Sequence, residues 1–187
     1  DERDMLEGFA RRLREIDFDL LMGYNSNYFD CRYWLNRCAL LGAGADVGLF
    51  RGGERPRMLM VESTSNQTGA RKTVVLDSPG RCFYDIYAFC RKHPRLALRQ
   101  YRLKDVVEAL KLKTVKGDVA YGDIHRFFNG TPQQRLELFR YCAGDALATD
   151  GTGIELGAVT ALVTRCQAFG ATPQDEVDRS PSPRLVH

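Results

Sequence analysis

Hydrophobic residues recur at helical spacing near the start of the chain and then gather in a short continuous run. Apolar side chains three or four positions apart predict an amphipathic helix over residues 4–16. Residues 19–23 read Asp-Leu-Leu-Met-Gly, an apolar run closed by glycine that predicts a short buried strand. A second helix is predicted over residues 30–41, with Asp30 in its first turn, where the positive end of the helix dipole favours a carboxylate.

The middle of the chain alternates apolar runs with stretches rich in glycine, arginine and polar residues. Residues 77–80, Asp-Ser-Pro-Gly, predict a turn, because proline presets φ and glycine supplies a positive φ. The pattern on either side of this turn predicts loops over 42–57 and 63–70, strands over 58–61 and 72–76, a strand running into a helix over 82–87, and a helix over 103–110.

The second half of the chain has a helical pattern. Thr131 followed by proline predicts a helix N-terminus, with threonine as the cap and proline at the first helical position. This helix is expected to continue through Asp145. Gly151 and Gly153 would each cost about 1 kcal/mol inside a helix, so they predict a break before a further helix over 154–169. Strands alternating with helices indicate an α/β layered domain.

Length and composition limit the class of protein without identifying a function. The 187 residues are 44% hydrophobic and 27% charged, which fits one globular domain and excludes a largely disordered chain. There is no run of 18 apolar residues, so no transmembrane helix is expected, and the acidic start does not resemble a signal peptide. The six cysteines form no C-x-x-C pair, and we interpret them as free thiols of a reducing compartment.

The net charge of +3 conceals a local asymmetry. Residues 91–116 contain nine of the 27 Lys and Arg residues and two of the 24 acids, which gives this stretch +7 and leaves −4 for the remainder. A basic stretch on a near-neutral body suits a polyanionic partner such as a nucleic acid. A solvated surface of helices and loops would carry the same charges, so composition leaves both interpretations open.

Two short stretches carry candidate chemistry. Residues 23–30 end a strand, turn, and present Asp30 at a helix start, at the rim of a sheet where α/β proteins place their sites. A simple helix cap is the alternative for this residue. Tyr141 and Asp145 lie four residues apart on one helix face, where the carboxylate could bind a divalent metal and the hydroxyl could orient a water. The alternative is a half-buried tyrosine beside a solvated acid.

Together these two stretches resemble the second and third exonuclease motifs of family B DNA polymerases. The residues between them resemble the same family in the same order. The matching segments are a Gly-Arg-strand-Asp segment over 80–87, a Tyr-x-Leu-x-x-Val helix start over 101–107 and an Asp-Leu-Ser-Tyr-x-Asp-Ile loop over 118–124. The resemblance covers residues 4–175, and the stretch 130–170 is most similar to the herpesvirus-type branch.

The resemblance implies a fold and a reaction. The expected fold is a ribonuclease H-like α/β exonuclease domain over residues 1–175, incomplete at its N-terminal strands, followed by an unassigned tail over 176–187. The family's exonuclease hydrolyses the 3′-terminal phosphodiester of DNA with two divalent metal ions held by carboxylates. The chain would therefore be part of a DNA-directed DNA polymerase that proofreads its product.

The same resemblance implies roles for five residues. Asp30 and Asp145 would be catalytic carboxylates that hold the metal ions, Mg²⁺ or Mn²⁺. Tyr141 would orient the attacking water. Asn25 and Phe29 match positions near the bound strand, and we expect them to contact DNA.

Two parts of the family pattern are missing from the sequence. The first exonuclease motif, Asp-x-Glu, is expected upstream of residue 1. The polymerase palm motifs are absent, since residues 121–123, Tyr-Gly-Asp, are followed by Ile-His rather than by the palm's second carboxylate. Asp85 matches a family aspartate but is given no catalytic role. We therefore expect the chain alone to have little exonuclease activity and no polymerase activity.

The implied partners are the single-stranded 3′ end and the primer–template DNA, the remainder of the polymerase chain and a processivity factor, with no membrane. The implied location is intracellular, and the host nucleus for a herpesvirus-type member. Two alternatives stay open: a degenerate exonuclease module that serves as a scaffold or DNA-binding domain, and a stand-alone single-strand-binding domain that uses residues 91–116. An Asp-x-Glu strand encoded upstream of residue 1 would favour the enzyme.

Overall fold

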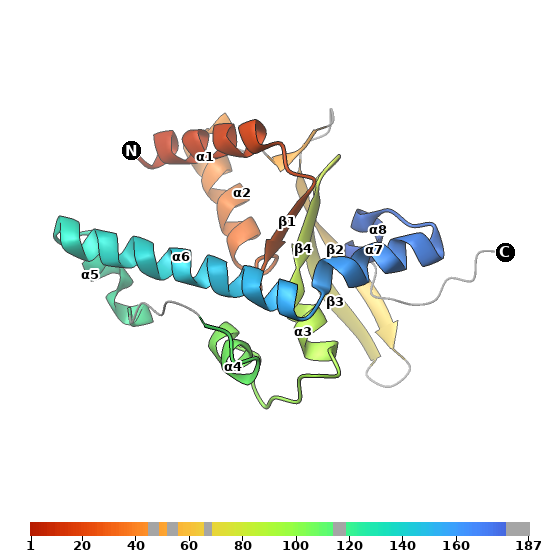
Figure 1. Ribbon diagram of the computed structural model, residues 1–187. Coiled ribbons are helices and arrows are strands. Elements are labelled where there is room, and N and C mark those ends of the chain that lie inside the picture. Colours follow the sequence, from red (N-terminus) through yellow and green to blue (C-terminus); the bar gives the residue numbers. More distant parts are fainter. Residues whose placement is uncertain (45–48, 52–55, 66–68, 114–118, 179–187) are drawn as a thin grey trace. The chain divides into compact units, whose positions relative to one another are not determined.

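The computed structural model describes residues 1–44, 49–51, 56–65, 69–113 and 119–178 (Figure 1). The chain forms two compact units. The first unit comprises residues 1–86 and 160–187, and the second comprises residues 87–159. Lys116, Asp118 and the end of the predicted tail, residues 179–187, lie outside the described residues.

The first unit begins with the helix–strand–helix order that the hydrophobic pattern predicts. Helix α1 (Glu2–Ile16) starts two residues earlier than expected, because Asp1 and Asp4 form a capping box at its N-terminus. Strand β1 (Leu20–Gly23) and helix α2 (Asp30–Leu41) follow, as predicted. Phe29 is the N-cap of α2, so Asp30 is the first helical residue and the cap alternative for it is wrong.

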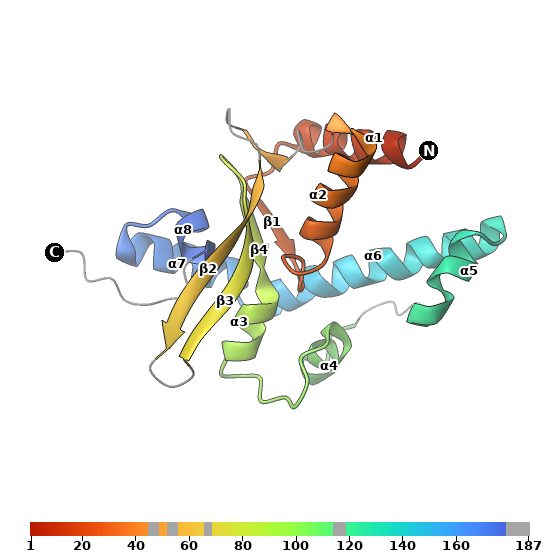
Figure 2. The same cartoon turned by 180° about the vertical axis from the view of Figure 1, so that it is seen from behind.

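Two pairs of strands form the sheets of this unit. Strands β2 (Arg57–Ser65) and β3 (Gly69–Asp77) pair antiparallel from Arg57–Asp77 to Ser65–Gly69. These strands extend into the stretch predicted as a polar loop over 63–70, because an antiparallel ladder is held by backbone hydrogen bonds that polar residues form as well as apolar ones. Strand β4 (Cys82–Asp85) pairs in parallel with β1, with Gly23 opposite Asp85. Figure 2 shows the long β2–β3 hairpin and the shorter β4 from behind.

Helices lie on both sides of these strands. Helices α2 and α8 (Pro173–Asp178) lie on opposite sides of the strands in both views (Figures 1 and 2). Helix α8 packs against β3 and β4, and the Gln174 amide donates to the Leu76 carbonyl at 3.1 Å. The arrangement is the α/β layering expected from the alternation of elements. Because α8 spans residue 175, an ordered helix crosses the predicted boundary between domain and tail.

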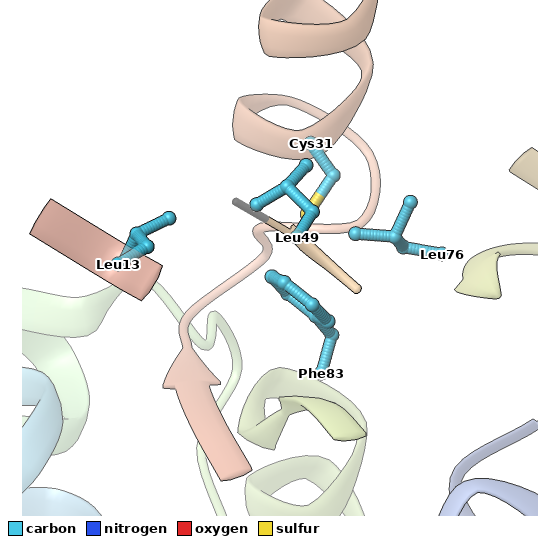
Figure 3. Close-up of a cluster of buried hydrophobic side chains, with 5 residues drawn as sticks. All are labelled: Leu13, Cys31, Leu49, Leu76 and Phe83. Carbon is cyan, nitrogen blue, oxygen red and sulfur yellow. The ribbon is translucent and has the colours of Figure 1, made fainter. Parts of the chain in front are cut away.

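The core of the first unit joins α1, α2 and the strands. Leu13, Cys31, Leu49, Leu76 and Phe83 are all buried and converge on one another (Figure 3). Burying a leucine or phenylalanine side chain stabilises a fold by about 1.5–3 kcal/mol. This cluster therefore holds the end of α1 and the start of β4 against the start of α2.

The Gly-Arg pair before β4 has a packing role. Gly80 has φ +76°, and a Cβ there would lie 2.8 Å from the Cβ of Arg51. The absent side chain lets the Arg51 amide donate to the Pro79 carbonyl at 2.8 Å. Arg81 is 5% exposed, and its guanidinium lies 4.3 Å from the centroid of the Phe18 ring. Arg81 also donates to the Phe18 carbonyl and to the Asp17 carboxylate, which ties β4 to the end of α1.

Helix α6 (Pro132–Glu155) dominates the second unit. It begins at Thr131 as predicted, with a capping box between Thr131 and Gln134. The predicted break at Gly151 and Gly153 is wrong, because both lie inside α6. A Cβ at Gly151 would lie 3.7 Å from a Leu112 methyl carbon, and Gly153 is buried. Packing of this helix face offsets the roughly 1 kcal/mol that each glycine costs.

Shorter elements complete the second unit. Contacts with α6 come from α4 (Leu103–Ala109) and α5 (Ile124–Phe128). Helix α3 (Ile86–Lys92) continues directly from β4, and the 3-10 helix η2 (Tyr121–Asp123) precedes α5. The break after α6 falls at Gly157, which has φ +65°, and α7 (Ala158–Phe169), most of which belongs to the first unit, follows it. None of the described helices is long and apolar enough to cross a lipid bilayer.

Candidate functional site

The turn between β1 and α2 accounts for the unusual sequence of residues 23–30. A Cβ at Gly23 would lie 2.3 Å from the Ser26 hydroxyl oxygen, so no larger residue fits where the strand ends. Asn25 has φ 60°, a left-handed conformation that asparagine tolerates better than most residues. Asn27 is buried, and its side-chain oxygen accepts a hydrogen bond from the Leu76 amide at 3.4 Å. These three residues thus specify the shape of the turn.

The carboxylate of Asp85 binds this turn from the neighbouring strand. Its two oxygens accept hydrogen bonds from the backbone amides of Asn25, at 2.8 Å, and of Asn27, at 3.1 Å. The two strands are parallel and end in register, so the last side chain of β4 lies beside the turn that leaves β1. The turn is therefore anchored to both β3 and β4.

Asp30 is exposed at the start of α2, where the sequence predicts a metal-binding carboxylate. Partial desolvation raises the pKa of Asp30, and the nearby negative charge of Asp85 raises it further. The thiol of Cys31 is buried next to these two acids, and desolvation raises its pKa to about 12. The negative charge of Asp85 thus disfavours the ionised form of Asp30, and a divalent cation bound at Asp30 would favour that form.

Phe29 lies beside Asp30 and presents an aromatic surface to solvent. The Phe29 side chain is 59% exposed and that of Tyr33 is 57% exposed, one helical turn later. The two rings are parallel within 9°, with centroids 6.4 Å apart. Exposed aromatic faces of this kind are used to stack the bases of single-stranded nucleic acids.

Tyr141 and Asp145 lie on one face of α6, four residues apart, as the spacing predicts. The Tyr141 side chain is half-buried and Asp145 is exposed. Desolvation raises the pKa of Tyr141, and the charge of Asp145 together with a hydrogen bond to its carboxylate raises it further. The Tyr141 hydroxyl therefore remains protonated beside the carboxylate. The nearby Cys142 thiol also has a raised pKa, mainly through desolvation.

The candidate residues fall into two groups. Asn25, Phe29 and Asp30 share one turn of the first unit, whereas Tyr141 and Asp145 share one helix of the second. Carboxylate oxygens are the ligands that Mg²⁺ prefers, so Asp30 and Asp145 fit a divalent cation as single ligands. Within the described part of the chain, however, no group of three or more His, Cys, Asp or Glu residues could hold a metal ion.

Sequence reasoning missed the contribution of Asp85 and Asn27. The sequence shows Asp85 as the polar residue that ends an apolar run, but it does not show which strand lies beside that run. Only the parallel pairing of β1 with β4 brings its carboxylate to the turn before Asp30. The two asparagines at positions 25 and 27 are a signal that could have indicated the role of Asn27, because asparagine side chains often form hydrogen bonds to the backbone in turns.

Residues 1–106 match the family model described as DNA polymerase family B, exonuclease domain. The chain belongs to this family. A structure of the family B DNA polymerase from the archaeon Pyrobaculum calidifontis has the same fold, with a TM-score of 0.62 and 22% identity over 94% of this chain and 21% of that chain.

Curated relatives include cellular and viral polymerases. The chain is 33% identical to the DNA polymerase delta catalytic subunit of Candida albicans over 147 residues, which is 78% of this chain and 14% of that protein. It is 32% identical to the DNA polymerase catalytic subunit of Epstein-Barr virus over 152 residues, with the same two coverages. The chain thus spans about a seventh of the length of these relatives. The nearly equal identities do not distinguish a herpesvirus-type from a cellular member.

Proposed function

We propose that this chain is part of the proofreading 3′→5′ exonuclease region of a DNA-directed DNA polymerase. The observation that carries the proposal is the match of residues 1–106 to the exonuclease-domain family model. The resemblance of residues 23–30 and 141–145 to the second and third exonuclease motifs of the family supports it. The substrate would be the single-stranded 3′ end of DNA, and the bond cleaved would be its terminal phosphodiester. The ribonuclease H-like character of the fold is part of the same proposal.

Each residue has a distinct role in this proposal. Asp30 and Asp145 would hold Mg²⁺ or Mn²⁺, and the bound ions would supply Lewis-acid stabilisation of the charge that develops at the phosphate. The Tyr141 hydroxyl, held by the Asp145 carboxylate, would orient the attacking water by a hydrogen bond. Asn25 and Phe29 would contact the DNA strand, the phenylalanine by stacking on a base. The remaining carboxylates would come from an Asp-x-Glu strand of the complete protein.

Replacing Tyr141 with phenylalanine tests its role. We expect kcat for 3′→5′ degradation of a single-stranded oligonucleotide by the complete polymerase to fall by about 10- to 100-fold, because a misplaced nucleophile lowers the rate by this order. KM should change little. Tyr101→Phe is the control, since its hydroxyl also donates a hydrogen bond, to the Leu96 carbonyl at 3.1 Å. Equal kcat values in the two variants would contradict the role of Tyr141.

Replacing Phe29 with alanine tests the proposed base contact. One lost stacking interaction is worth about 1–3 kcal/mol, so KM for a single-stranded oligonucleotide in the exonuclease reaction should rise by roughly 5- to 150-fold. Phe128→Ala is the matched control, because its side chain is 57% exposed, close to the 59% of Phe29. A similar KM in both variants would argue against a DNA contact at Phe29.

The complete protein would act with DNA as primer–template and with the remainder of the polymerase chain, and a processivity factor is a further candidate partner. It would work inside the cell, and a herpesvirus-type member would work in the host nucleus. The competing function is a degenerate exonuclease module kept as a scaffold. Metal-dependent cleavage that requires Asp30 and Asp145 would exclude that function.

A further inference from the structure

Asp85 lies beside the turn that leads into α2. It is the last residue of β4 and pairs in register with Gly23, the last residue of β1. Both strands run in the same direction, so their ends lie at the same edge of the two-stranded sheet. The Asp85 side chain therefore lies next to the chain as it leaves β1 and turns toward α2.

Asp85 accepts hydrogen bonds from two backbone amides that have no backbone acceptor within the turn. The Asn25 amide donates to one carboxylate oxygen at 2.8 Å, and the Asn27 amide donates to the other at 3.1 Å. Hydrogen bonds from backbone amides to an ionised carboxylate are stronger than those to a neutral acceptor. Because Asn25 has a left-handed backbone with φ 60°, this anchor also holds a conformation that a free chain seldom adopts.

The position of this turn also affects the position of Asp30. Helix α2 has Phe29 as its N-cap, and phenylalanine has no polar side chain with which to cap a helix. One of the first helical amides is instead bound by the turn: the Cys31 amide donates to the Ser26 carbonyl at 2.9 Å. A displaced turn would therefore shift the first residue of α2, which is Asp30.

We propose that Asp85 is a positioning residue of the exonuclease reaction, which holds the Asn25–Asn27 turn and thereby sets the place and direction of the Asp30 carboxylate. The inference rests on the proposed function of Asp30. Asp85 would act through the backbone and not as a metal ligand, because both of its oxygens already accept amide hydrogen bonds. The same acid also adds negative potential at Asp30.

Hydrogen exchange measured by mass spectrometry on the complete polymerase tests the structural half of this inference. In Asp85→Asn the amide group can accept at one atom only, so peptides that cover residues 24–30 should take up deuterium about tenfold faster. Asp77→Asn is the matched control, because Asp77 also ends a strand and pairs with Arg57 at 2.9 Å. Unchanged uptake at residues 24–30 in Asp85→Asn would overturn the inference.

Steady-state kinetics test the functional half. We expect Asp85→Asn to lower kcat for single-strand degradation by about 10- to 100-fold at saturating Mg²⁺, with KM for the oligonucleotide and the rate of primer extension unchanged. Asp85→Glu, which keeps both acceptor oxygens, should recover part of the amide protection and part of kcat. A general loss of structure would instead lower primer extension as well.

The outcomes separate this inference from the function on which it rests. If the unsubstituted polymerase degrades DNA and Asp85→Asn degrades it equally fast, the positioning role is wrong and the proposed function stands. If the unsubstituted polymerase shows no 3′→5′ cleavage, the proposed function and any catalytic role of Asp85 are both wrong. The exchange measurement would still decide in that case whether Asp85 holds the turn.

Discussion

Replacing Asp145 with alanine is expected to lower the 3′→5′ exonuclease rate of the complete polymerase by about 1,000-fold or more. A bound metal ion stabilises the transition state by several kcal/mol, and each 1.4 kcal/mol corresponds to a tenfold change in rate. Asp30→Ala should have an effect of the same order, because each residue would supply one ligand oxygen. The measurement is single-turnover degradation of a 5′-labelled single-stranded oligonucleotide with Mg²⁺.

The control for this prediction lies on the same helix. Asp150 is an exposed acid of α6, five residues beyond Asp145, and Asp150→Ala should leave the exonuclease rate within about threefold of the unsubstituted protein. Primer extension should persist in all three variants. Cleavage by Asp145→Ala at a rate close to that of Asp150→Ala would contradict a ligand role for Asp145.

The chain of residues 1–187 provides a further arm of this experiment. We expect it to show little cleavage by itself, because the proposed metal site needs carboxylates beyond Asp30 and Asp145. Metal-dependent 3′→5′ degradation by the purified chain, lost on Asp145→Ala, would refute this expectation while supporting the assignment of Asp145.

The second large effect is expected on stability. Arg81→Ala should lower the free energy of unfolding by about 2–4 kcal/mol, because it removes a buried side chain together with its hydrogen bonds and its contact with an aromatic ring. The Arg81 side chain is 2% exposed and lies 3.2 Å from the Asp17 carboxylate. Arg81→Lys should recover only part of this loss, since an ammonium group cannot reproduce the planar fork of a guanidinium.

Urea unfolding followed by circular dichroism would measure this difference. Arg12→Ala is the control, because Arg12 forms an ion pair with Glu15 at 3.0 Å in which both side chains are more than half exposed. Such surface pairs contribute about 0–1 kcal/mol. An Arg81→Ala variant as stable as Arg12→Ala would show that the buried arginine does not join β4 to α1.

The pattern of apolar and polar residues determined most of the first unit in advance. The bounds of α2 and the capped start of α6 agree with the predictions, because local signals indicate both: an acid in the first turn in one case, and threonine followed by proline in the other. Local signals failed at Gly151 and Gly153, where packing against α6 outweighs glycine's low helix propensity. They also failed at residues 63–65, which pair across a hairpin.

The candidate site also has features that the sequence predicts and features that it does not predict. Asp30, Tyr141 and Asp145 could be selected from the sequence, because a motif is a matter of residue type and spacing along the chain. The surroundings of these residues could not be predicted in the same way. The spacing of Tyr141 and Asp145 predicts only that they share a helix face, and nothing in the sequence predicts that Asp85 raises the pKa of Asp30. Asp85 and Asn25 are 60 residues apart in the chain.

The sequence by itself determined the element types, the family resemblance and the acids that a metal-dependent nuclease needs. Only the tertiary structure explains why the turn before Asp30 has these particular residues. Gly23 is required by the close approach of Ser26 within the turn. The Asn25 amide and the Asn27 side chain, in contrast, bond to Asp85 and to the Leu76 amide, which only folding brings near. The pairing of β1 with β4 is a contact between distant segments, and it is set by packing of the whole unit rather than by any local pattern.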